Sequence, residues 1–441
     1  MQASLQRNRE LSLLILGLIV GGGALALVVA ANNAKNIGLA TPLITVLAAI
    51  YVAAHLVMRR VARNADGMLL PLAAILNGLG LAAVYRLSPE KYGAAQLTWT
   101  LVGVACFAGT MLLVRDVQVL GRFKYLLGFT GVALLLLPMV PGIGREISGA
   151  QLWVQLGSFR FQPGELSKIF LVVFFAAYLA DRKELLSMAT RRILGMHVPD
   201  LKHFGPLLVM WGLSLAVMFY AKDLGSSLLF FSVFLVMIYL ATARIVYVAA
   251  GGALFAAGAY IGYRTFGHVR ERVLVWLDVF NPDYVQDEGY QLAQSLFALA
   301  AGGLFGTGLG QGRPDLIPAA HTDFIFSVLG QELGLLGAAA VLLCFLLLVG
   351  RGLKIALAQS NDFAQLLAAG LTVVLGIQTI IILGGVTRLL PLTGITLPFM
   401  SYGGSSLISN FILIALLARI SHQGASERPA AHTAEILIGG R

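Results

Sequence analysis

Apolar stretches of about 20 residues recur along the chain, separated by short polar segments. A helix of about 20 residues crosses a hydrocarbon core of about 30 Å, and it satisfies its own backbone hydrogen bonds in lipid. The stretches lack the period-2 alternation of a transmembrane β-barrel. The pattern therefore predicts an all-α polytopic membrane protein. About twelve transmembrane helices are expected near residues 12–31, 39–58, 67–85, 97–114, 124–141, 165–180, 204–221, 223–242, 245–264, 322–350, 363–386 and 395–419.

Two segments on the same side of this bundle are longer than simple connections. The first reads PGIGREISGAQLWVQLGSFRFQPG, over residues 141–164, and the second covers residues 265–321. Loops of that length are usually functional or disordered. The second contains RERVLVWLDVF and YQLAQSLFALAAGGLFGTGLG, which are apolar and amphipathic. We expect both runs to form helices lying at the membrane interface.

Composition and charge agree with this class and orient the bundle. Hydrophobic residues make up 58% of the 441 residues, and charged residues make up 12%, against roughly 25% in a soluble domain. With the N-terminus inside, most Lys and Arg residues fall in inner loops, which predicts cytoplasmic termini. The outer side nevertheless stays basic within the net charge of +10, which indicates an anionic partner there. The inner residues are Arg59, Arg60, Arg63, Arg115, Arg122, Lys124, Arg182, Lys183, Arg191, Arg192, Lys202, Arg351 and Lys354.

The chain ends and the cysteines are interpreted conservatively. The first apolar run has no convincing small-residue cleavage site, so a retained span is favoured over a signal peptide. Cys106 and Cys344 lie inside apolar runs and are expected to be small core residues. Residues 421–441 are predicted to be a disordered cytoplasmic tail.

Isolated charged residues mark the outer ends of several predicted spans. Glu165 and Lys168 are three residues apart on one helix face and can pair. Asp223 and Asp323 each stand at the start of a span, where either could simply cap the helix. Taken together, groups far apart in sequence meet on one side of the membrane, which is the pattern of a cavity that opens outward.

Two glycine-rich segments need a structural reading. GGLFGTGLGQG resembles a dinucleotide fingerprint, but no β-strand precedes it and the chain has no βαβ unit. Gly302, Gly303, Gly306 and Gly308 are instead expected to allow a tight turn close to the membrane. SYGGSS, residues 401–406, is read as a broken or closely packed helix start.

Four stretches resemble the SEDS family of membrane glycosyltransferases, which includes RodA, FtsW and SpoVE. They are GAQLWVQLGSFRFQPGELSKI, AKDLGSSL, PAAHTDFIFSVLGQELGLLG and LLPLTGITLPFMSYGGSSL. Residues 67–420 match the ten-helix family core in order, and residues 1–66 supply two additional helices. That extension, with GGVTRLLPLTG and ALLARISH, resembles actinobacterial RodA-type members.

The resemblance implies an enzyme that polymerises lipid II into peptidoglycan glycan strands. In this inverting transfer, the C4 hydroxyl of one GlcNAc attacks C1 of a lipid-linked MurNAc and expels undecaprenyl diphosphate. The family's essential carboxylate falls on Asp323, a hypothetical general base whose pKa a desolvated boundary would raise toward 6–7. Glu165 and Lys168 form a supporting pair. The candidates for binding substrate or diphosphate are Trp153, Arg160, Gln162, Asp223, Arg270, Arg272, Ser401, Gly403 and Gly404.

The sequence departs from the family pattern beside some of these residues. Gly164 occupies a position where the family usually has Ser. In the same way, Lys222 replaces Pro, Leu152 replaces Arg, Ile382 replaces Asn and Arg388 replaces Gly. None of these changes removes a carboxylate, so they bear on substrate contacts rather than on activity.

The implied partners are lipid II, the lipid-linked glycan strand, membrane lipid and a class B penicillin-binding protein that cross-links the product. No nucleic-acid partner is expected. A divalent cation, Mg or Mn, is compatible with the resemblance, but no local ligand cluster indicates one. The implied location is the inner membrane with the site facing outward. Three alternatives stay open: a division-specific FtsW-type polymerase, a polyprenyl-lipid flippase or transporter, and a noncatalytic scaffold.

Overall fold

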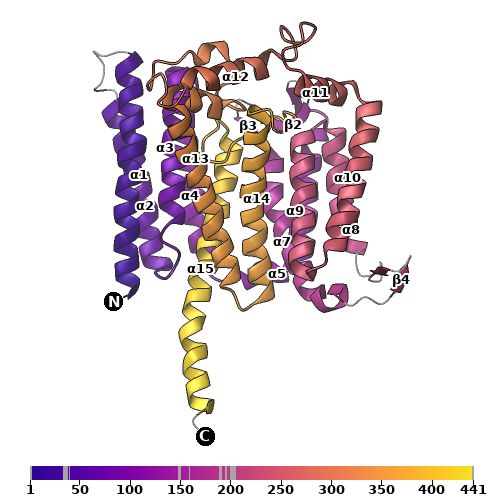
Figure 1. The fold of residues 1–441 in the computed structure, drawn as a ribbon. Coiled ribbons are helices and arrows are strands. Elements are labelled where there is room, and N and C mark those ends of the chain that lie inside the picture. Colours follow the sequence, from indigo (N-terminus) through magenta and orange to yellow (C-terminus); the bar gives the residue numbers. More distant parts are fainter. Residues whose placement is uncertain are drawn as a thin grey trace.

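The computed structural model describes residues 2–32, 38, 40–147, 150–157, 159–187, 191–193, 196–198 and 205–439. Its long helices run side by side in one bundle, with both chain ends at the same end of it (Figure 1). We call that the lower end. The opposite, upper end carries the short strands β1–β3 and the helices α11 and α12, which lie across the bundle (Figure 1).

The helices are α1 Gln2–Asn32, α2 Ala40–Val61, α3 Leu69–Leu87, α4 Ala94–Leu113, α5 Gln118–Arg122, α6 Lys124–Leu136, α7 Pro163–Ser187, α8 Gly205–Tyr220, α9 Leu224–Thr242, α10 Ile245–Thr265, α11 Gly267–Leu277, α12 Tyr290–Gly302, α13 Ile325–Leu357, α14 Asp362–Val386 and α15 Gly404–Gly439. Three short turns of other helix types are η2 Pro89–Gly93, η3 Leu137–Met139 and η5 Pro314–Leu316. The strands are β1 Gly144–Ile147, β2 Ala150–Leu156, β3 Phe159–Phe161, β4 Arg191–Ile193 and β5 Met196–Val198.

The helical membrane architecture is confirmed. Among the described residues, ten helices are long and apolar enough to cross a membrane, and two shorter apolar helices, Lys124–Met139 and Gly205–Tyr220, lie where two further spans were expected. The count of twelve spans therefore stays a prediction. Leu113, Leu346 and Leu357 expose large apolar side chains, as a lipid-facing surface requires.

The last two predicted boundaries differ from the structure. α13 begins at Ile325, not at residue 322, and α15 begins at Gly404, not at residue 395. Residues 387–403, which we call the connector, form turns and extended chain at the upper end instead of a helix start. Apolar residues such as Ile395 and Leu397 suggested a span, but they are buried against protein.

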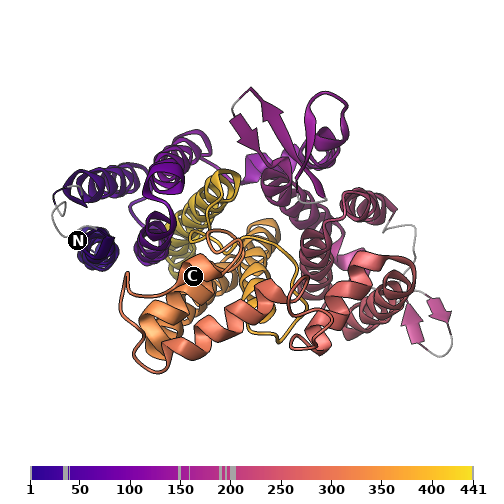
Figure 2. The ribbon, with the colours of Figure 1, turned by 90° about the horizontal axis from the view of Figure 1, so that it is seen from above.

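Interfacial helices were expected in the second long segment, and the structure places α11 and α12 there. Seen from above, they lie over the ends of the long helices (Figure 2). The first long segment departs from the all-α expectation, because it forms an antiparallel sheet of order β1-β2-β3. Its register pairs Arg145 with Trp153 and Val154 with Phe161. A further small sheet pairs β4 with β5.

The core of the bundle lies around α3, α7, α14 and α15. Within the apolar membrane-spanning stretch of each of these four helices, 72–83% of the residues are buried inside the protein. The corresponding share in α10 is 11%. A helix that is apolar all round and buried by protein belongs to the interior, so the polar side chains on α7, α14 and α15 meet inside the protein. α10 is correspondingly peripheral, as both ribbon views agree (Figures 1 and 2).

Glycines shape the upper part of α13. Gly334 has φ 67° and ψ −170°, which interrupts the helix, and Gly306 has φ 83°. The chain at residues 303–308 pairs with this break, since Leu335 N donates to Gly303 O (2.9 Å) and Gly308 N to Glu332 O (3.0 Å). A Cβ at Gly302 would lie 2.1 Å from Gly330 O. These contacts agree with the tight turn expected here.

Polar side chains also gather at the lower end, in what we call the lower cluster: Arg7, Glu10, His55, Asp66 and Arg351. Arg7 pairs with Glu10, His55 Nδ1 lies 2.7 Å from Glu10 Oε1, and Arg351 pairs with Asp66. Arg7, Glu10 and His55 are at most 2% exposed. Glu10 thereby joins α1 to His55 of α2, and Asp66, between α2 and α3, joins this part of the chain to Arg351 of α13.

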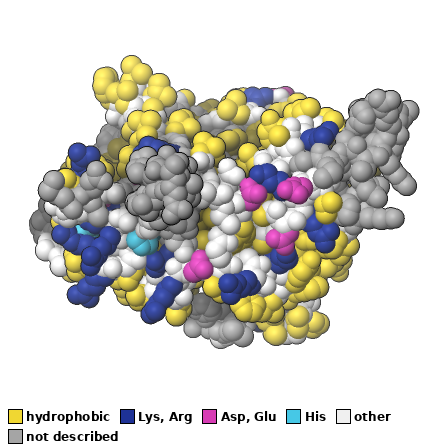
Figure 3. Space-filling model, turned by 90° about the horizontal axis from the view of Figure 1, so that it is seen from below, with side chains coloured by type: hydrophobic (Ala, Val, Ile, Leu, Met, Phe, Trp, Pro, Cys, Tyr) yellow, Lys and Arg dark blue, Asp and Glu magenta, His cyan; other side chains and the backbone are white. Residues whose placement is uncertain are grey.

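Exposed Lys and Arg side chains are distributed over the lower face (Figure 3). They include Arg59, Arg60, Arg63, Arg115, Arg122 and Lys354. From the same end, α15 extends beyond the bundle (Figure 1). Residues 421–439, expected to be disordered, are described as a continuation of this helix to Gly439.

Candidate active site

Glu165, Asp223 and Asp323 all lie at the upper end and share one electrostatic environment. Arg272 on α11 interacts with both Asp323 and Asp223, and Asp223 also interacts with Glu165. The carboxylates come from α7, from the N-cap of α9 and from the residues just before α13. The bundle thus brings together groups that are as far apart in sequence as Glu165 and Asp323.

Glu165 and Lys168 pair as their spacing predicted. Lys168 Nζ lies 2.6 Å from Glu165 Oε2, and both residues are less than 9% exposed. Ser409 Oγ donates to the same Oε2 (3.1 Å), and Lys168 Nζ donates to Gln378 Oε1 (2.8 Å). The pair therefore bonds α7 to α15 and α14. Each charge has a second polar partner, which a buried ion pair requires.

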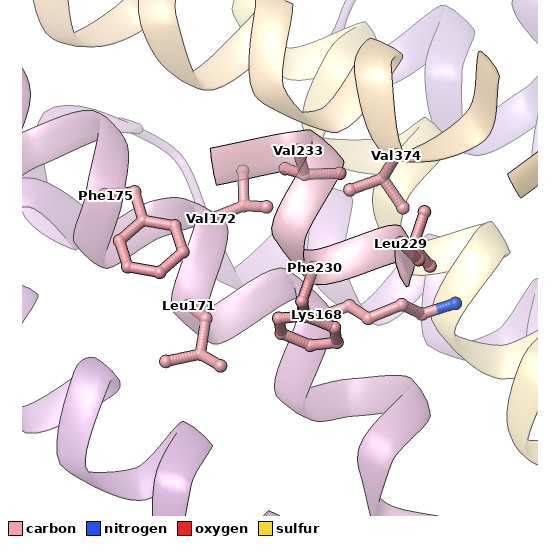
Figure 4. Close-up of a pocket in the computed structure, with 8 residues that line it drawn as sticks. All are labelled: Lys168, Leu171, Val172, Phe175, Leu229, Phe230, Val233 and Val374. Atoms are coloured by element: carbon pink, nitrogen blue, oxygen red, sulfur yellow. The ribbon is translucent and has the colours of Figure 1, made fainter. Parts of the chain in front are cut away.

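A small cavity of about 10 Å³ borders the Lys168 side chain between α7, α9 and α14. That is about the volume a single water molecule requires. Figure 4 shows Lys168 along one wall with its nitrogen pointing away from Phe175. Its other lining side chains are apolar: Leu171, Val172, Phe175, Leu229, Phe230, Val233 and Val374. This cavity is too small for a lipid or a sugar, so substrate is not placed in it.

Asp323 is half-buried beside the connector. A Cβ built at Gly394, whose φ is +73°, would lie 3.6 Å from Asp323 Oδ2. Burial raises the pKa of Asp323 to about 6, while a hydrogen bond from Thr322 and the charge of Arg272 lower it. Among the described residues Asp323 forms no salt bridge within 4 Å. A carboxylate with this pKa is largely ionised at neutral pH, yet it can accept a proton.

Arg272 is fixed by the connector. Its Nη1 donates to Leu392 O (2.8 Å). Nearby on α11, Trp276 Nε1 donates to Arg388 O (3.2 Å) and Arg388 Nε donates to Trp276 O (2.9 Å). Burial lowers the pKa of the guanidinium, and the charges of Asp323 and Asp223 raise it. Arginine remains protonated in such a site, so Arg272 supplies a fixed positive charge.

Asp223 is both a helix cap and a member of the charged site. Its Oδ1 accepts from Ser226 N (2.9 Å) and so caps α9. Burial nevertheless raises its pKa; the bonds from Ser226 lower it, Glu165 raises it and Arg272 lowers it. Asp223 is therefore a helix cap that also faces the site charges.

The remaining predicted residues are spread around this centre. Trp153 on β2 and Gln162 are half-buried, whereas Arg160 on β3 and Arg270 on α11 are exposed. β2 reaches the α8–α9 turn, where Gln151 N donates to Ala221 O (3.4 Å). Within the part of the chain that the structure describes, no hydrogen bond or salt bridge of the Arg270 side chain is present. Arg160 and Arg270 therefore have cationic groups available to an anionic ligand.

Ser401, Gly403 and Gly404 have contacts within the protein. Ser401 Oγ donates to Thr322 O (2.6 Å) and accepts from Leu397 N (2.8 Å). A Cβ at Gly404 would lie 2.2 Å from the Trp99 ring, and a Cβ at Gly403 would only touch Thr396 and Ser406 at 3.6 Å. Ser401 and Gly404 thus shape the backbone of the site; Gln162 N similarly donates to Ser405 Oγ (2.8 Å).

Positive-φ residues other than glycine concentrate near the site. Lys222, Ala319, Arg388 and Phe399 have φ between 52° and 65°. Such conformations cost of order 1–3 kcal/mol and persist where surrounding contacts impose them. Two lie in the connector and two flank Asp223 and Asp323 closely in sequence. Lys222 and Arg388 are also positions where the chain departs from the family pattern.

Gln378 and Ser409 were missed by the sequence analysis. Each is a polar residue inside an apolar run, and such residues in a span usually have a partner in the bundle interior. That signal was present in LGIQTIIIL and SLISNFIL. It could not say which charge each one meets.

The described residues do not form a metal site. No group of three or more His, Cys, Asp and Glu side chains converges among them, and the charged group that acts on Asp323 is the Arg272 guanidinium. Mg²⁺ commonly takes one or two carboxylates together with substrate phosphates. Mg or Mn thus stays a hypothesis tied to the substrate, and no step below is derived through it.

Comparison with known proteins decides the family. The family model of the cell cycle proteins FtsW, RodA and SpoVE matches residues 67–426. The chain belongs to this family. The peptidoglycan glycosyltransferases RodA of Mycobacterium tuberculosis and Mycobacterium leprae are each 46% identical to it, over 95% of this chain and 91% and 90% of their own lengths. A probable peptidoglycan glycosyltransferase FtsW of a Geobacter species is 34% identical over 82% of this chain and 98% of its own length.

Solved structures of the family share the fold. A chain from a peptidoglycan synthase complex has a TM-score of 0.66 and 26% identity, covering 82% of this chain and 98% of its own length. The rod shape determining protein RodA of Thermus thermophilus has a TM-score of 0.55 and 27% identity, covering 81% of this chain and 96% of its own length. These values agree with the matched family range, which begins at residue 67.

Proposed function

We propose that the upper end of the bundle is where this protein polymerises lipid-linked disaccharides, with Asp323 as the general base. The chain is a peptidoglycan glycosyltransferase, on the strength of its family and its RodA relatives. The residues that carry out the transfer, and their roles, are the proposal. One observation carries it: a half-buried carboxylate of raised pKa interacts electrostatically with a fixed arginine, among side chains gathered from α7, α9 and α11.

In the reaction we propose, Asp323 accepts the proton of the acceptor's C4 hydroxyl as that oxygen attacks C1 of the donor sugar. The C1–oxygen bond to undecaprenyl diphosphate breaks, and the diphosphate leaves as an anion. A positioned base of this kind contributes about 10²–10⁴-fold to rate. A pKa of about 6 suits a base at neutral pH, because most of it is ionised while it still binds a proton in the transition state.

Positive charge is needed where the diphosphate departs. Arg272 is held by Leu392 of the connector and acts electrostatically on Asp323, and Arg160 and Arg270 are exposed at the same end. Arginine can bind phosphate oxygens through two parallel hydrogen bonds. We therefore assign diphosphate binding to these three arginines. Lys168 is given a supporting role, since Glu165 and Gln378 already accept its hydrogen bonds.

The RodA relatives favour a function in cell elongation and cell shape over a division-specific one. The flippase and scaffold alternatives are less favoured, because the RodA relatives, which match almost the whole chain, are glycosyltransferases. We further propose that the upper end faces the outside of the cytoplasmic membrane. The exposed arginine and lysine side chains distributed over the lower face support that orientation (Figure 3). A class B penicillin-binding protein is the proposed partner, in line with the solved peptidoglycan synthase complex.

The decisive experiment is polymerisation of labelled lipid II by the purified protein, alone and with a class B penicillin-binding protein. Asp323→Asn keeps the side-chain shape and removes its basicity, so we expect a loss of at least about 10²-fold. Asp315→Asn is the matched control, because Asp315 is an exposed carboxylate at the same end that forms a salt bridge with Arg313. Wild-type rates with Asp323→Asn would refute the assignment.

A further inference from the structure

Three aromatic side chains meet next to Asp323, and none of them was singled out by the sequence. Tyr92 of η2 stacks on His321, with ring centroids 4.2 Å apart and planes at 11°. Tyr402 of the connector lies against both, at 5.0 Å from Tyr92 and 5.8 Å from His321. We call Tyr92, His321 and Tyr402 the aromatic clamp. It joins three segments: the α3–α4 connection, the residues before α13, and the connector.

Hydrogen bonds to backbone carbonyls reinforce the same junction. Tyr402 N donates to His321 O (2.8 Å), and Ser401 Oγ donates to Thr322 O (2.6 Å). Gln96 on α4 holds Ser401 in turn, through a bond from its Nε2 to Ser401 O (3.2 Å). The carbonyls of both residues that precede Asp323 are therefore held by the connector.

We propose that the aromatic clamp positions Asp323 for catalysis, with Tyr92 and His321 acting as positioning residues through their ring stack. The proposal rests on the role of Asp323 as base. It requires no contact of either ring with substrate. In this proposal Tyr92, in the α3–α4 connection, helps to hold the catalytic base in place. That connection supplies none of the charged residues Glu165, Asp223 and Arg272.

The turn before α13 needs such support. Ala319 has φ +52°, and the turn is closed by Thr322, whose N and Oγ1 both donate to Ala319 O (3.0 and 3.2 Å). A non-glycine residue in this region is strained and keeps its conformation where surrounding contacts impose it. A stacked aromatic pair contributes beyond its buried area. Without the stack, we expect residues 321–323 to move toward water.

The charges around the clamp determine what that movement does. On the site side Asp323 faces Arg272, and behind it Asp223 and Glu165. On the clamp side Lys91 lies 4.9 Å from the Tyr92 ring centroid, and Arg160 acts on Tyr402. Burial and then Lys91 lower the pKa of His321, so the imidazole is neutral at neutral pH. The dominant effect of movement is then hydration of Asp323, which lowers its pKa toward the ordinary value.

The test measures the initial rate of lipid II polymerisation from pH 5 to 9, together with thermal unfolding, for full-length protein. We expect Tyr92→Ala and His321→Ala to lower the rate at pH 7.5 by about tenfold and to move the acidic limb of the pH profile down by at least half a pH unit. Tyr92→Phe and His321→Phe keep the stack and should keep both the rate and the limb. Phe297→Ala, which removes another stack at the upper end (Phe280 with Phe297, 5.6 Å), is the matched control and should leave the limb in place.

The outcomes separate the two proposals. If the alanine variants lower the rate and the unfolding temperature but leave the acidic limb in place, the clamp is only structural and the inference is wrong. Unchanged rates in the alanine variants would also overturn it, provided that Asp323→Asn is inactive in the same assay. If Asp323→Asn itself retains activity, the proposed function fails, and the clamp inference fails with it.

Discussion

The two ends of the bundle both bury charged side chains, but they treat them differently. In the lower cluster, Glu10 pairs with Arg7 and His55, and Asp66 pairs with Arg351. At the upper end, the Glu165–Lys168 pair is equally closed, while Asp323 is half-buried, with its pKa raised to about 6. Among the described residues, no basic side chain lies within salt-bridge distance of Asp323.

This difference separates structural charges from reactive ones. A buried charge with a close partner is satisfied, and removing the partner costs several kcal/mol. In the described part of the chain, Asp323 has no cation within salt-bridge distance, so the cost of burying its negative charge is only partly offset. That cost raises the proton affinity of the carboxylate. The lower cluster holds the N-terminal helices to α13, whereas Asp323 retains the capacity to take up a proton.

The largest effect is expected when the closed pair at the upper end is opened. Lys168→Met leaves the Glu165 carboxylate buried with Ser409 as its main partner, so we expect a loss of about 3–5 kcal/mol in the free energy of unfolding, together with loss of activity. Thermal unfolding in mild detergent and lipid II polymerisation measure the two quantities. The neutral double variant Glu165→Gln with Lys168→Met should recover most of the stability. Full recovery of activity as well would mean that the pair is only structural.

Opening the lower cluster should affect stability alone. Glu10→Gln leaves Arg7 buried with the Ala65 carbonyl, and we expect destabilisation by about 3 kcal/mol. The rate per folded molecule should stay at the wild-type value, because the cluster is at the opposite end from Asp323. A large fall in the rate of the folded fraction would show that the two ends are coupled.

Asp323→Asn makes the same chemical change at the upper end and should have the opposite effect on stability. Because the folded-state pKa of about 6 exceeds the ordinary aspartate value of 3.8, Asp323 contributes stability below pH 4 that is lost as the pH rises through 6. Ionised Asp323 therefore destabilises the fold by up to about 3 kcal/mol at pH 8. We expect Asp323→Asn to unfold at a higher temperature than wild type at pH 8 and at a similar temperature at pH 4. A lower unfolding temperature at pH 8 would contradict this.

The smallest predicted effect concerns the longer-range cation. Arg272 lowers the pKa of Asp323, so Arg272→Gln should raise that pKa and move the acidic limb of the polymerisation rate upward by less than about one pH unit. The direction is opposite to that expected for Tyr92→Ala. The pH profile of each variant measures both shifts, and a downward shift with Arg272→Gln would exclude the proposed electrostatic coupling.

The comparison also shows which features were predictable. Glu165 with Lys168 was predicted as a pair because a three-residue spacing on a helix is a local property. The clustering of Asp223 and Asp323 at one end followed from the order of the predicted membrane spans, because successive spans cross in opposite directions. Nothing local linked Gln378 to Lys168, Ser409 to Glu165 or Tyr92 to His321, since those contacts depend on which helices are neighbours. The expected helix over residues 395–403 was wrong because burial by protein and burial in lipid favour the same apolar residues.

The sequence by itself determined that the chain is a helical membrane protein, that its carboxylates gather at one end of the bundle and which family it resembles. Hydropathy and charge act residue by residue against lipid and water, so their consequences can be read along the chain. Only the tertiary structure decided that the lower charges are paired, that the connector holds Arg272, and that Asp323 is left with a raised pKa. Those outcomes depend on distances between side chains from different helices, and such distances exist only once the bundle has packed.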